Sequence, residues 1–439
     1  MTLKQYDNIN NEFLHLIPHT ASNVLELGCS GGRLAEVFKS LHPEAKWTGI
    51  DVSSRSLSAS VKRMDEVVLM DLNHPRKEDL PGSNYDTLIM GDVLEHLSNP
   101  LDAMKFVHEV STPDAQVLCC MPIMTNIGII ERMLLGDLSY DEYGLLDSTH
   151  LRFMSIASTI KLFLDAGWLP NIVGTRYCGI GGGEARDYTF TEQLIQAAAT
   201  RGIPRSTAER NLHSFQIYVH GVKSPKAETT PTSSFSVIVP VNNSTIYNVN
   251  IGHSPGLKEV NAQIIPVYNA TNAAEAFAEG CKTATNKWIL YCHQDTYIPA
   301  GSGYMLAELF ETYKKNAMFG FAGTTLDGQA GLMIDRTNKF DKPIGTGVVQ
   351  SIDEFAIALS TDFAPTIDSA LGWHLWATDL CLQAQAHHSL NVHICQIPMF
   401  HNSVTENFTS QSFLDSLEVL KAKYPGYGRL NALTGQFDL

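Results

Sequence analysis

Hydrophobic and polar positions follow two alternating patterns along this chain of 439 residues. Short apolar runs, typical of buried strands, are followed by longer stretches in which apolar residues recur every three or four positions, as in amphipathic helices. In the first half, the apolar runs lie near residues 24–27, 46–51, 66–70, 85–90, 115–121, 169–176 and 214–221. Strands that alternate with helices in this way predict a seven-stranded, doubly wound α/β sheet.

A polar break separates this series of runs from a second one. Residues 223–234 contain two prolines and no large apolar side chain, which predicts a solvated linker. The linker divides the chain into a domain at 1–222 and a domain at 235–439. In the second domain, apolar runs at 235–241, 262–268 and 287–292, with a helical pattern over 271–285, predict another α/β sheet.

The first apolar run ends in a turn of small residues, 28–32, before a helical pattern begins. Glycines in such a turn keep side chains away, so a ligand can approach the backbone closely. Glu26 places a carboxylate just before the turn, which repels phosphate and favours a cationic or amine-bearing ligand. Asp51 ends the second run, where an acidic residue reaches a ribose diol in this kind of α/β unit.

With these spacings, the first half of the chain resembles class I S-adenosylmethionine-dependent methyltransferases. The resemblance rests on Glu26-x-Gly28-x-Ser30-x-Gly32, on Asp51 and on the segment 92–96, Asp-Val-Leu-Glu-His. Serine replaces the family's middle glycine, which is a mild change because serine is small. The resemblance implies S-adenosylmethionine as cofactor, with Asp71 and Leu72 beside the adenine. The residues implied to bind it are Glu26, Gly28, Ser30, Gly32, Asp51, Asp71, Leu72 and Asp92. The alternative is a Rossmann-like domain that has lost its cofactor.

Two histidines are candidates for the catalytic base that takes a proton from an acceptor hydroxyl. His150 lies in the segment 147–153, and similar segments lie beside the acceptor site in methyltransferases of this subgroup. A neighbouring aspartate, such as Asp147, can orient a histidine and tune its pKa. A packing role for His150 is an equal alternative, and His96 has the simpler interpretation of orienting the loop under the cofactor. We expect residues 124–147 to form a lid over the acceptor, a sugar or small glycan.

The second half, over about 235–425, resembles a GT-A type glycosyltransferase of the family 2-like group. The matching segments are Ser236–Pro240, His293–Asp295, Trp373–Asp379 and Phe400–Asn402. The resemblance implies a nucleotide-sugar-binding sheet, a nucleotide sugar donor and a sugar or glycan acceptor. The chain departs from the family in its metal motif, because the usual Asp-x-Asp is reduced to His293-Gln294-Asp295.

Three residues of the second half are candidates for the glycosyl-transfer chemistry. A diphosphate leaving group needs its charge neutralised, and Asp295 and His401 are the candidate ligands for Mn²⁺ or Mg²⁺. An imidazole ligand favours Mn²⁺. Asp379 matches the base position of inverting enzymes. The alternatives are a helix N-cap for Asp379 and an ordinary turn residue for Asp295.

Composition narrows the class of protein and its setting. The formal net charge of −15 argues against nucleic-acid binding, which needs a basic surface. No apolar run approaches the ~20 residues of a transmembrane segment, and the first residues lack a signal-peptide core. The eight cysteines form no Cys-x-x-Cys pair, so we expect a reduced, cytoplasmic protein.

Together these patterns predict two Rossmann-like domains in a bifunctional cytoplasmic enzyme of surface-glycan biosynthesis, such as O-antigen or capsule. One domain would methylate a sugar or glycan hydroxyl and the other would transfer a sugar. The alternative is a glycan methyltransferase whose C-terminal domain is a non-catalytic glycan- or nucleotide-binding module. The sugar, the methylated position and the oligomeric state are left open by the sequence.

Overall fold

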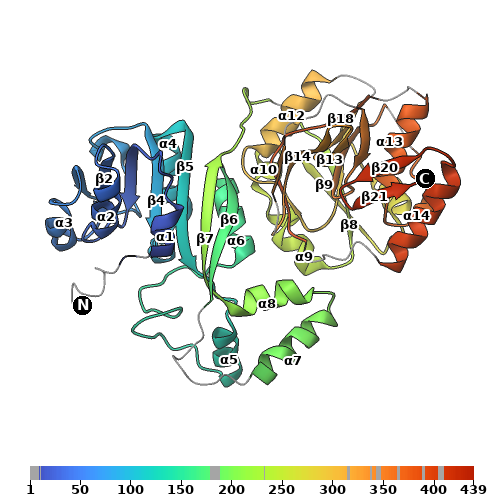
Figure 1. Cartoon of the computed structure of the whole chain (residues 1–439). Coiled ribbons are helices and arrows are strands. Elements are labelled where there is room, and N and C mark those ends of the chain that lie inside the picture. Colours follow the sequence, from blue (N-terminus) through green and yellow to red (C-terminus); the bar gives the residue numbers. More distant parts are fainter. Residues whose placement is uncertain are drawn as a thin grey trace. The chain divides into compact units, whose positions relative to one another are not determined.

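A computed structural model describes residues 9, 11–177, 188–231, 233–313, 317–336, 339–342, 348–362, 366–387, 391–403 and 410–439. The chain divides into two compact units, Met1–Ser224 and Pro225–Leu439 (Figure 1). Each unit contains its own sheets and its own hydrophobic core. No helix in the described part of the chain is long and apolar enough to cross a membrane.

The first unit is built on one seven-stranded sheet in the order β3-β2-β1-β4-β5-β7-β6. Its strands are β1 (Asn23–Leu27), β2 (Lys46–Asp51), β3 (Glu66–Leu69), β4 (Tyr85–Gly91), β5 (Ser111–Pro122), β6 (Trp168–Tyr177) and β7 (Ser214–Lys223). Neighbours from β3 to β5 pair in parallel, whereas β7 is antiparallel to both β5 and β6. All seven predicted strands are confirmed.

The strand order reverses between β1 and β4, and this reversal positions the site. In open α/β sheets, ligands bind at such a switch point, beyond the carboxyl ends of the strands. The connecting helices are α1 (Asn11–Leu16), α2 (Arg33–Leu41), α3 (Ser54–Ser60), α4 (Pro100–Val110) and α6 (Ile156–Asp165), with short 3₁₀ turns at Lys77–Asp79 and at η3 (Leu94–His96). Phe13, Phe38 and Leu57 anchor α1, α2 and α3 in one core with Trp47 of β2.

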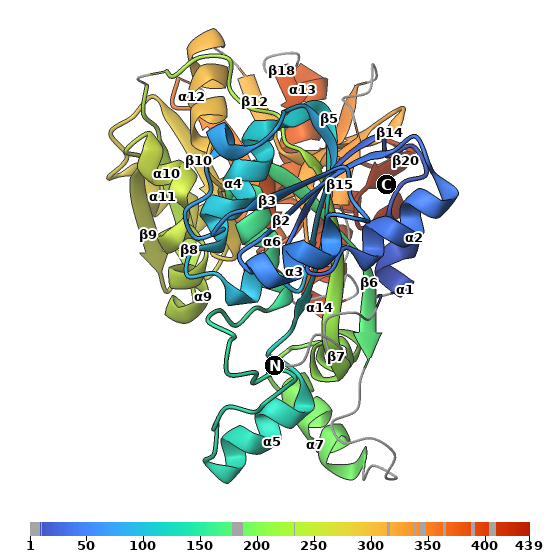
Figure 2. The same ribbon diagram turned by 90° about the vertical axis from the view of Figure 1, so that its left-hand side faces the viewer.

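Three further helices form a small cluster at the same edge of the sheet. They are α5 (Ile127–Leu135), α7 (Tyr188–Ala199) and α8 (Arg205–His213), which share a core of Ile127, Ile195, Ala208 and Leu212. α5 follows the end of β5, and α8 precedes the start of β7, so the cluster lies beyond the carboxyl ends of the parallel strands. Figure 1 and Figure 2 both show it projecting from the sheet. The predicted lid at 124–147 contains α5.

The second unit contains a six-stranded sheet in the order β18-β12-β17-β10-β8-β9. Its strands are β8 (Ser236–Val241), β9 (Gln263–Tyr268), β10 (Trp288–Cys292), β12 (Ala317–Gly320), β17 (Ala356–Ser360) and β18 (Asn391–Ile394). β8 pairs in parallel with both β9 and β10, as the sequence predicted. The predicted helix at 271–285 is α11 (Ala273–Cys281), which lies on β8 so closely that a Cβ on Gly280 would be 2.5 Å from Ile238.

A second sheet in this unit completes the architecture. It has the order β11-β19-β14-β13-β16, with β15 paired to β14, and a separate hairpin joins β20 to β21. These strands are β11 (Thr296–Tyr297), β13 (Ala322–Thr325), β14 (Gly328–Ile334), β15 (Lys339–Lys342), β16 (Val349–Ile352), β19 (Met399–His401), β20 (Arg429–Ala432) and β21 (Gly435–Asp438). The remaining helices are α9 (Ser244–Val249), α10 (Pro255–Glu259), α12 (Ser302–Thr312), α13 (Trp376–His387) and α14 (Gln411–Lys423), with 3₁₀ turns at Ile251–His253 and Ser369–Leu371.

Candidate functional site

In the turn after β1, Gly28 packs directly against the loop after β4, because glycine has no side chain. Gly28 has φ +70°, and a Cβ there would lie 2.5 Å from Val93 Cγ2. Gly32, with φ +75°, precedes α2, and its Cβ would lie 3.0 Å from Ser60 Cβ. Both positions therefore need glycine for backbone conformation and for space.

Asp51 holds the turn in shape. Its carboxylate accepts hydrogen bonds from the backbone N–H of Ser30 (2.9 Å) and of Ser53 (2.8 Å). Ser30 adopts φ 47°, a left-handed conformation that serine tolerates at some energetic cost. The serine that replaces the family's glycine is thus accommodated at this position, with its N–H bonded to Asp51.

Glu26 lies buried at the end of β1. Its Oε2 accepts a hydrogen bond of 2.8 Å from Trp47 Nε1, and the residue is 7% exposed. Burial and the negative charge of Asp51 raise the pKa of Glu26 to about 8. The hydrogen bond from Trp47 lowers the pKa but does not cancel this shift. A positively charged ligand group would favour the ionised form, which is the arrangement expected for an amine-binding carboxylate.

The remaining predicted cofactor contacts lie at the ends of β3 and β4. Asp71 is exposed and accepts hydrogen bonds from the backbone and side chain of Asn73, whereas Leu72 is buried. Asp92 has φ 53° and accepts hydrogen bonds from Gln216 Nε2 (2.6 Å) and Cys120 Sγ (3.4 Å).

The two predicted catalytic histidines form a pair. The rings of His96 and His150 lie edge to face with their centroids 4.9 Å apart. Nδ1 of His150 contacts the carbonyl of Leu145 at 3.1 Å, and Nδ1 of His96 lies 3.2 Å from the carbonyl of Thr149. Asp147 instead accepts hydrogen bonds from Thr149, so it orients the loop and not the ring of His150 directly.

Glu95 completes this group and was missed by the sequence analysis. One ligand atom each of Glu95, His96 and His150 lies within 4.8 Å of the others. Glu95 is 1% exposed, and its Oε2 has no hydrogen-bond partner among the described residues. Burial, together with the charge of Asp92, raises the pKa of Glu95 well above its ordinary value. The sequence signal was present in the Glu-His pair of the segment 92–96.

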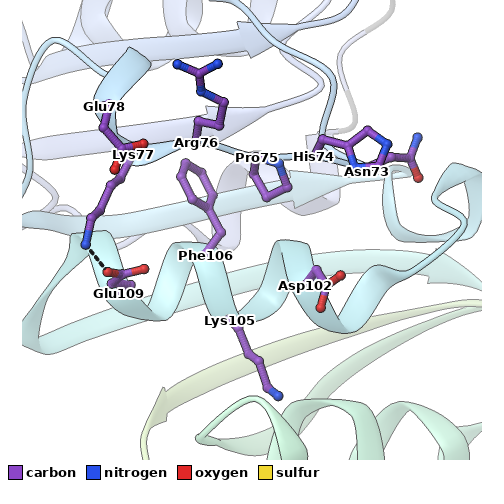
Figure 3. Close-up of a pocket in the computed structure, with 10 residues that line it drawn as sticks. All are labelled: Asn73, His74, Pro75, Arg76, Lys77, Glu78, Asp102, Lys105, Phe106 and Glu109. Carbon is purple, nitrogen blue, oxygen red and sulfur yellow. Dashed lines mark hydrogen bonds and ion pairs between the residues drawn. The ribbon is translucent and has the colours of Figure 1, made fainter.

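A separate cavity of about 450 Å³ lies beside α4, away from these residues. Figure 3 shows Lys77 reaching Glu109 of α4 at one end and Asn73 with His74 at the other. None of the predicted site residues lines it. Asn73 and His74, which line the cavity, both donate hydrogen bonds to Asp71 and so connect the cavity to the site.

In the second unit, the structure brings Asp295 and His401 together. β11 pairs with β19 so that Thr296 faces His401, and His401 Nε2 lies 3.4 Å from Asp295 Oδ1. Burial raises the pKa of Asp295, but the charge and hydrogen bond of His401 outweigh it and lower that pKa to about 2.

His293 is a third member of this cluster that the sequence analysis did not assign. Its Nδ1 lies 3.4 Å from His401 Nε2 and 4.0 Å from Asp295 Oδ1. An ion with bonds of about 2.1 Å holds neighbouring ligands ~3.0–3.4 Å apart, so these separations are close to those of a formed site. The intervening Gln294 bonds the backbone of Asn242 and so ties this turn to the end of β8.

Asp379 lies apart from this cluster and is fully buried in the first turn of α13. Its carboxylate accepts hydrogen bonds from Lys423 Nζ (2.8 Å), Gln383 Nε2 (2.7 Å) and Tyr424 OH (2.7 Å). These three partners line a cavity of about 560 Å³, but Asp379 does not. The contacts are those of a residue that joins α13 to α14.

Glu354 is another carboxylate that sequence reasoning missed. It precedes Phe355, whose carbonyl accepts a hydrogen bond from His293 N (2.8 Å) and whose ring lies 5.3 Å from that of His401. Glu354 Oε1 is buried, and no described residue forms a hydrogen bond with it. Burial and the charge of Asp353 raise the pKa of Glu354 to about 8, opposed by the backbone N–H of Leu375. Leu375 has φ 61°, an uncommon conformation for leucine.

Comparison with known families agrees with this division into two units. Residues 4–169 match the family described as a methyltransferase domain, and residues 236–387 match the family described as glycosyltransferase like.

Individual relatives match only part of the chain. Ubiquinone biosynthesis O-methyltransferases of Ruegeria pomeroyi and Roseobacter denitrificans are each 27% identical over 105 residues. That match spans 23% of this chain and 42% of each relative. A crystal structure of a SAM-dependent methyltransferase from Archaeoglobus fulgidus covers 51% of this chain and 95% of its own, with 16% identity and a TM-score of 0.36. The chain therefore joins a methyltransferase domain, at residues 4–169, to a domain of the glycosyltransferase like family, at residues 236–387.

Proposed function

We propose that this chain is a bifunctional transferase of surface-glycan biosynthesis, of the O-antigen or capsule kind. Its first unit would methylate a hydroxyl of a sugar or glycan with S-adenosylmethionine. Its second unit would transfer a sugar from a nucleotide sugar. A cytoplasmic setting is supported by the cysteines, which form no disulfide in the part of the chain that the structure describes.

The arrangement at the β1/β4 switch point carries the methyl-transfer proposal. Asp51 is already fixed by two backbone N–H groups and would accept hydrogen bonds from the ribose hydroxyls. Glu26 would bind the amino group of the methionine end. The backbone at Gly28, Ser30 and Gly32 would approach the cofactor closely, and the remaining contacts would come from Asp71, Leu72 and Asp92.

The histidine pair would activate the acceptor in this mechanism. In methyl transfer, a C–O bond forms as the bond between the sulfonium sulfur and the methyl carbon breaks, and the acceptor hydroxyl loses its proton. His150 and His96 lie beside the loop after β4, and in the simplest form of the mechanism an imidazole nitrogen takes that proton. The curated relatives are named O-methyltransferases, which supports an oxygen acceptor. A glycan acceptor is supported by the glycosyltransferase-like domain in the same chain.

In the second unit, the proposed metal site would neutralise the diphosphate leaving group. Asp295 and His401 would bind the ion, with His293 as a third ligand. Two imidazoles and one carboxylate favour Mn²⁺ over Mg²⁺, because Mg²⁺ prefers oxygen ligands. Glu354 precedes Phe355, whose ring lies near that of His401, and Glu354 would take the proton of the acceptor hydroxyl. Asp379 remains the competing candidate for the catalytic base.

Calorimetry on the full chain tests the proposal. UDP-, GDP-, dTDP- and CMP-sugars would be titrated with and without Mn²⁺, and S-adenosylhomocysteine would be titrated separately. We expect Mn²⁺-dependent binding of one donor and metal-independent binding of S-adenosylhomocysteine. Failure to bind S-adenosylhomocysteine would contradict the methyltransferase assignment, and failure to bind any nucleotide sugar would contradict the glycosyltransferase assignment.

A second candidate function is a glycan methyltransferase whose C-terminal unit binds a glycan or nucleotide without turnover. The engagement of Asp379 by Lys423 and Tyr424 favours it, because these contacts already occupy the carboxylate that an inverting mechanism would use as base. Donor binding without release of nucleoside diphosphate, in the presence of a panel of glycan acceptors, would support the binding module.

A further inference from the structure

We propose that Glu95, His96 and His150 form a binding site for a divalent transition-metal cation in the first unit. Glu95 and His96 come from the 3₁₀ turn η3 after β4, and His150 comes from a loop 54 residues further along the chain. The two segments are fixed to each other because the carbonyl of Glu95 accepts hydrogen bonds from the backbone N–H of Leu151 (2.7 Å) and of Arg152 (3.0 Å).

The hydrogen bonds of the two rings suit metal ligation. With Nδ1–H donated to a backbone carbonyl, a neutral imidazole keeps its lone pair on Nε2, and metal-ligating histidines usually have such a partner. His150 has the carbonyl of Leu145 in this role, and His96 has that of Thr149. One nitrogen of each ring and one carboxylate oxygen of Glu95 lie within 4.8 Å of one another.

The carboxylate of Glu95 provides the second, independent observation. The residue is 1% exposed, and in the part of the chain that the structure describes its Oε2 has no hydrogen-bond partner. Buried polar atoms without partners are rare because their desolvation is not compensated. A cation bound between Glu95 and the two rings would compensate it.

The surrounding charge also favours a cation. Asp92 and Asp147 both act electrostatically on the histidine pair. Within the described residues, no lysine or arginine forms an ion pair with Glu95, Asp92 or Asp147. A divalent cation bound here would therefore meet three carboxyl groups that no described side-chain cation neutralises, and it would favour their ionised forms.

The donor set selects the class of metal. Two imidazole nitrogens and one carboxylate oxygen suit Mn²⁺, Fe²⁺, Co²⁺ or Zn²⁺ better than Mg²⁺ or Ca²⁺. Bound ligand atoms would lie ~3.0–3.4 Å apart, so the side chains would close inward by about 1 Å on binding. Three protein ligands leave coordination positions open, as in catalytic metal sites.

The metal site would extend the mechanism of the proposed methyl transfer, and its catalytic role depends on that proposed function. A hydroxyl oxygen bound at an open position would lose its proton to solvent more readily, because the cation lowers the pKa of the hydroxyl. The histidine pair would then activate the acceptor as metal ligands and not as direct proton acceptors. The preferred acceptor would be one with two adjacent oxygens, since it can occupy two open positions.

Metal counting on the full chain tests the inference. The chain would carry Asp295→Asn and His401→Asn to remove the candidate site of the second unit, and would be stripped of metal with EDTA. Free Mn²⁺ would then be measured by electron paramagnetic resonance during a titration. We expect one bound Mn²⁺ per chain, and at least about tenfold weaker binding after Glu95→Gln or His150→Asn. The matched control is His74→Asn, an exposed histidine of the same unit, which should leave binding unchanged.

Binding of S-adenosylhomocysteine by each variant reports whether the first unit is folded. Absence of bound Mn²⁺ in the parent protein would overturn the inference, as would unchanged affinity in folded Glu95→Gln and His150→Asn variants. Methyl transfer that persists in EDTA would overturn the role in activation while leaving the proposed function intact. Loss of S-adenosylhomocysteine binding in the parent protein would instead contradict the proposed function.

Discussion

The carboxylate of Glu26 and the indole of Trp47 face each other in the buried end of the first sheet, with Glu26 Oε2 accepting a hydrogen bond of 2.8 Å from Trp47 Nε1. No cationic side chain offsets this carboxylate among its electrostatic partners, and burial raises its pKa to about 8. The Glu26 carboxyl is therefore mostly protonated at pH 7 in the absence of ligand and becomes ionised when a positively charged group binds beside it.

This relationship predicts that affinity for S-adenosylhomocysteine rises with pH. Between pH 6 and pH 8 the free protein must lose the proton of Glu26 before its carboxylate can bind the ligand's ammonium group. The affinity should increase by up to about tenfold per pH unit and level off above pH 8. Calorimetry at pH 6, 7 and 8 measures it. Glu26→Gln should bind more weakly and show a flat profile, whereas a pH-dependent Glu26→Gln variant would assign the titration to another group.

Substitution of Gly28 by alanine should abolish cofactor binding. The new Cβ would lie 2.5 Å from Val93 Cγ2 in a backbone with φ +70°, so the loops after β1 and β4 would move apart. We expect at least about 100-fold weaker S-adenosylhomocysteine binding and a loss of about 1–3 kcal/mol in unfolding free energy. Urea denaturation and calorimetry measure the two effects.

Gly82→Ala is the matched control, because no atom lies within 4 Å of its added Cβ. Adding Val93→Ala to Gly28→Ala removes the clash but leaves the φ strain, so it should restore part of the stability. A Gly28→Ala variant that binds normally would contradict the predicted close approach of the cofactor to this turn.

Asp379 and Glu354 should respond to substitution in opposite ways. Asp379→Asn breaks a buried ion pair with Lys423, so we expect it to reduce the unfolding free energy by about 3 kcal/mol. Glu354→Gln keeps the side-chain volume and should change stability by less than about 1 kcal/mol, but reduce sugar transfer at least ~100-fold. Urea denaturation and release of nucleoside diphosphate distinguish them. A stable Asp379→Asn variant without turnover would restore Asp379 as the base.

Replacing His293 by aspartate should change the metal preference of the second unit. His293→Asp converts the ligand set from two imidazoles and a carboxylate to one imidazole and two carboxylates. Oxygen ligands favour Mg²⁺, so the ratio of Mg²⁺ to Mn²⁺ affinity should rise by about tenfold or more. Donor binding in each metal measures this ratio, with Gln294→Glu as a control on the intervening residue. An unchanged ratio would show that His293 is not a ligand.

The sequence predicted the framework of both units because their strands are short apolar runs bounded by turn residues. It also predicted the proximity of Asp295 and His401, which the pairing of β11 with β19 creates. It did not predict the third members of either cluster, Glu95 and His293. Whether a carboxylate is left without a partner, or a ring faces its neighbours, depends on packing between loops that are far apart in sequence.

Asp379 shows the same limit of prediction from sequence. The sequence motif identified Asp379 as a candidate base. Its partners Lys423 and Tyr424 lie 44 and 45 residues further along the chain, so the motif did not predict them. A carboxylate at the start of a helix can be a cap, a base or half of an ion pair, and tertiary contacts alone distinguish these roles.

The place of β7 in the first sheet has a consequence for synthesis on the ribosome. Among the described strands, β6 pairs with β7 alone, and β7 lies between β6 and β5. Until Lys223 has left the exit tunnel, the emerging chain presents β6 without any hydrogen-bonding neighbour and β5 with one bare edge. Completion of the first unit therefore waits for the residues that immediately precede the second. A nascent chain stalled before Ser214 should remain open to proteases and chaperones, whereas one stalled well after Ser224 should be protected.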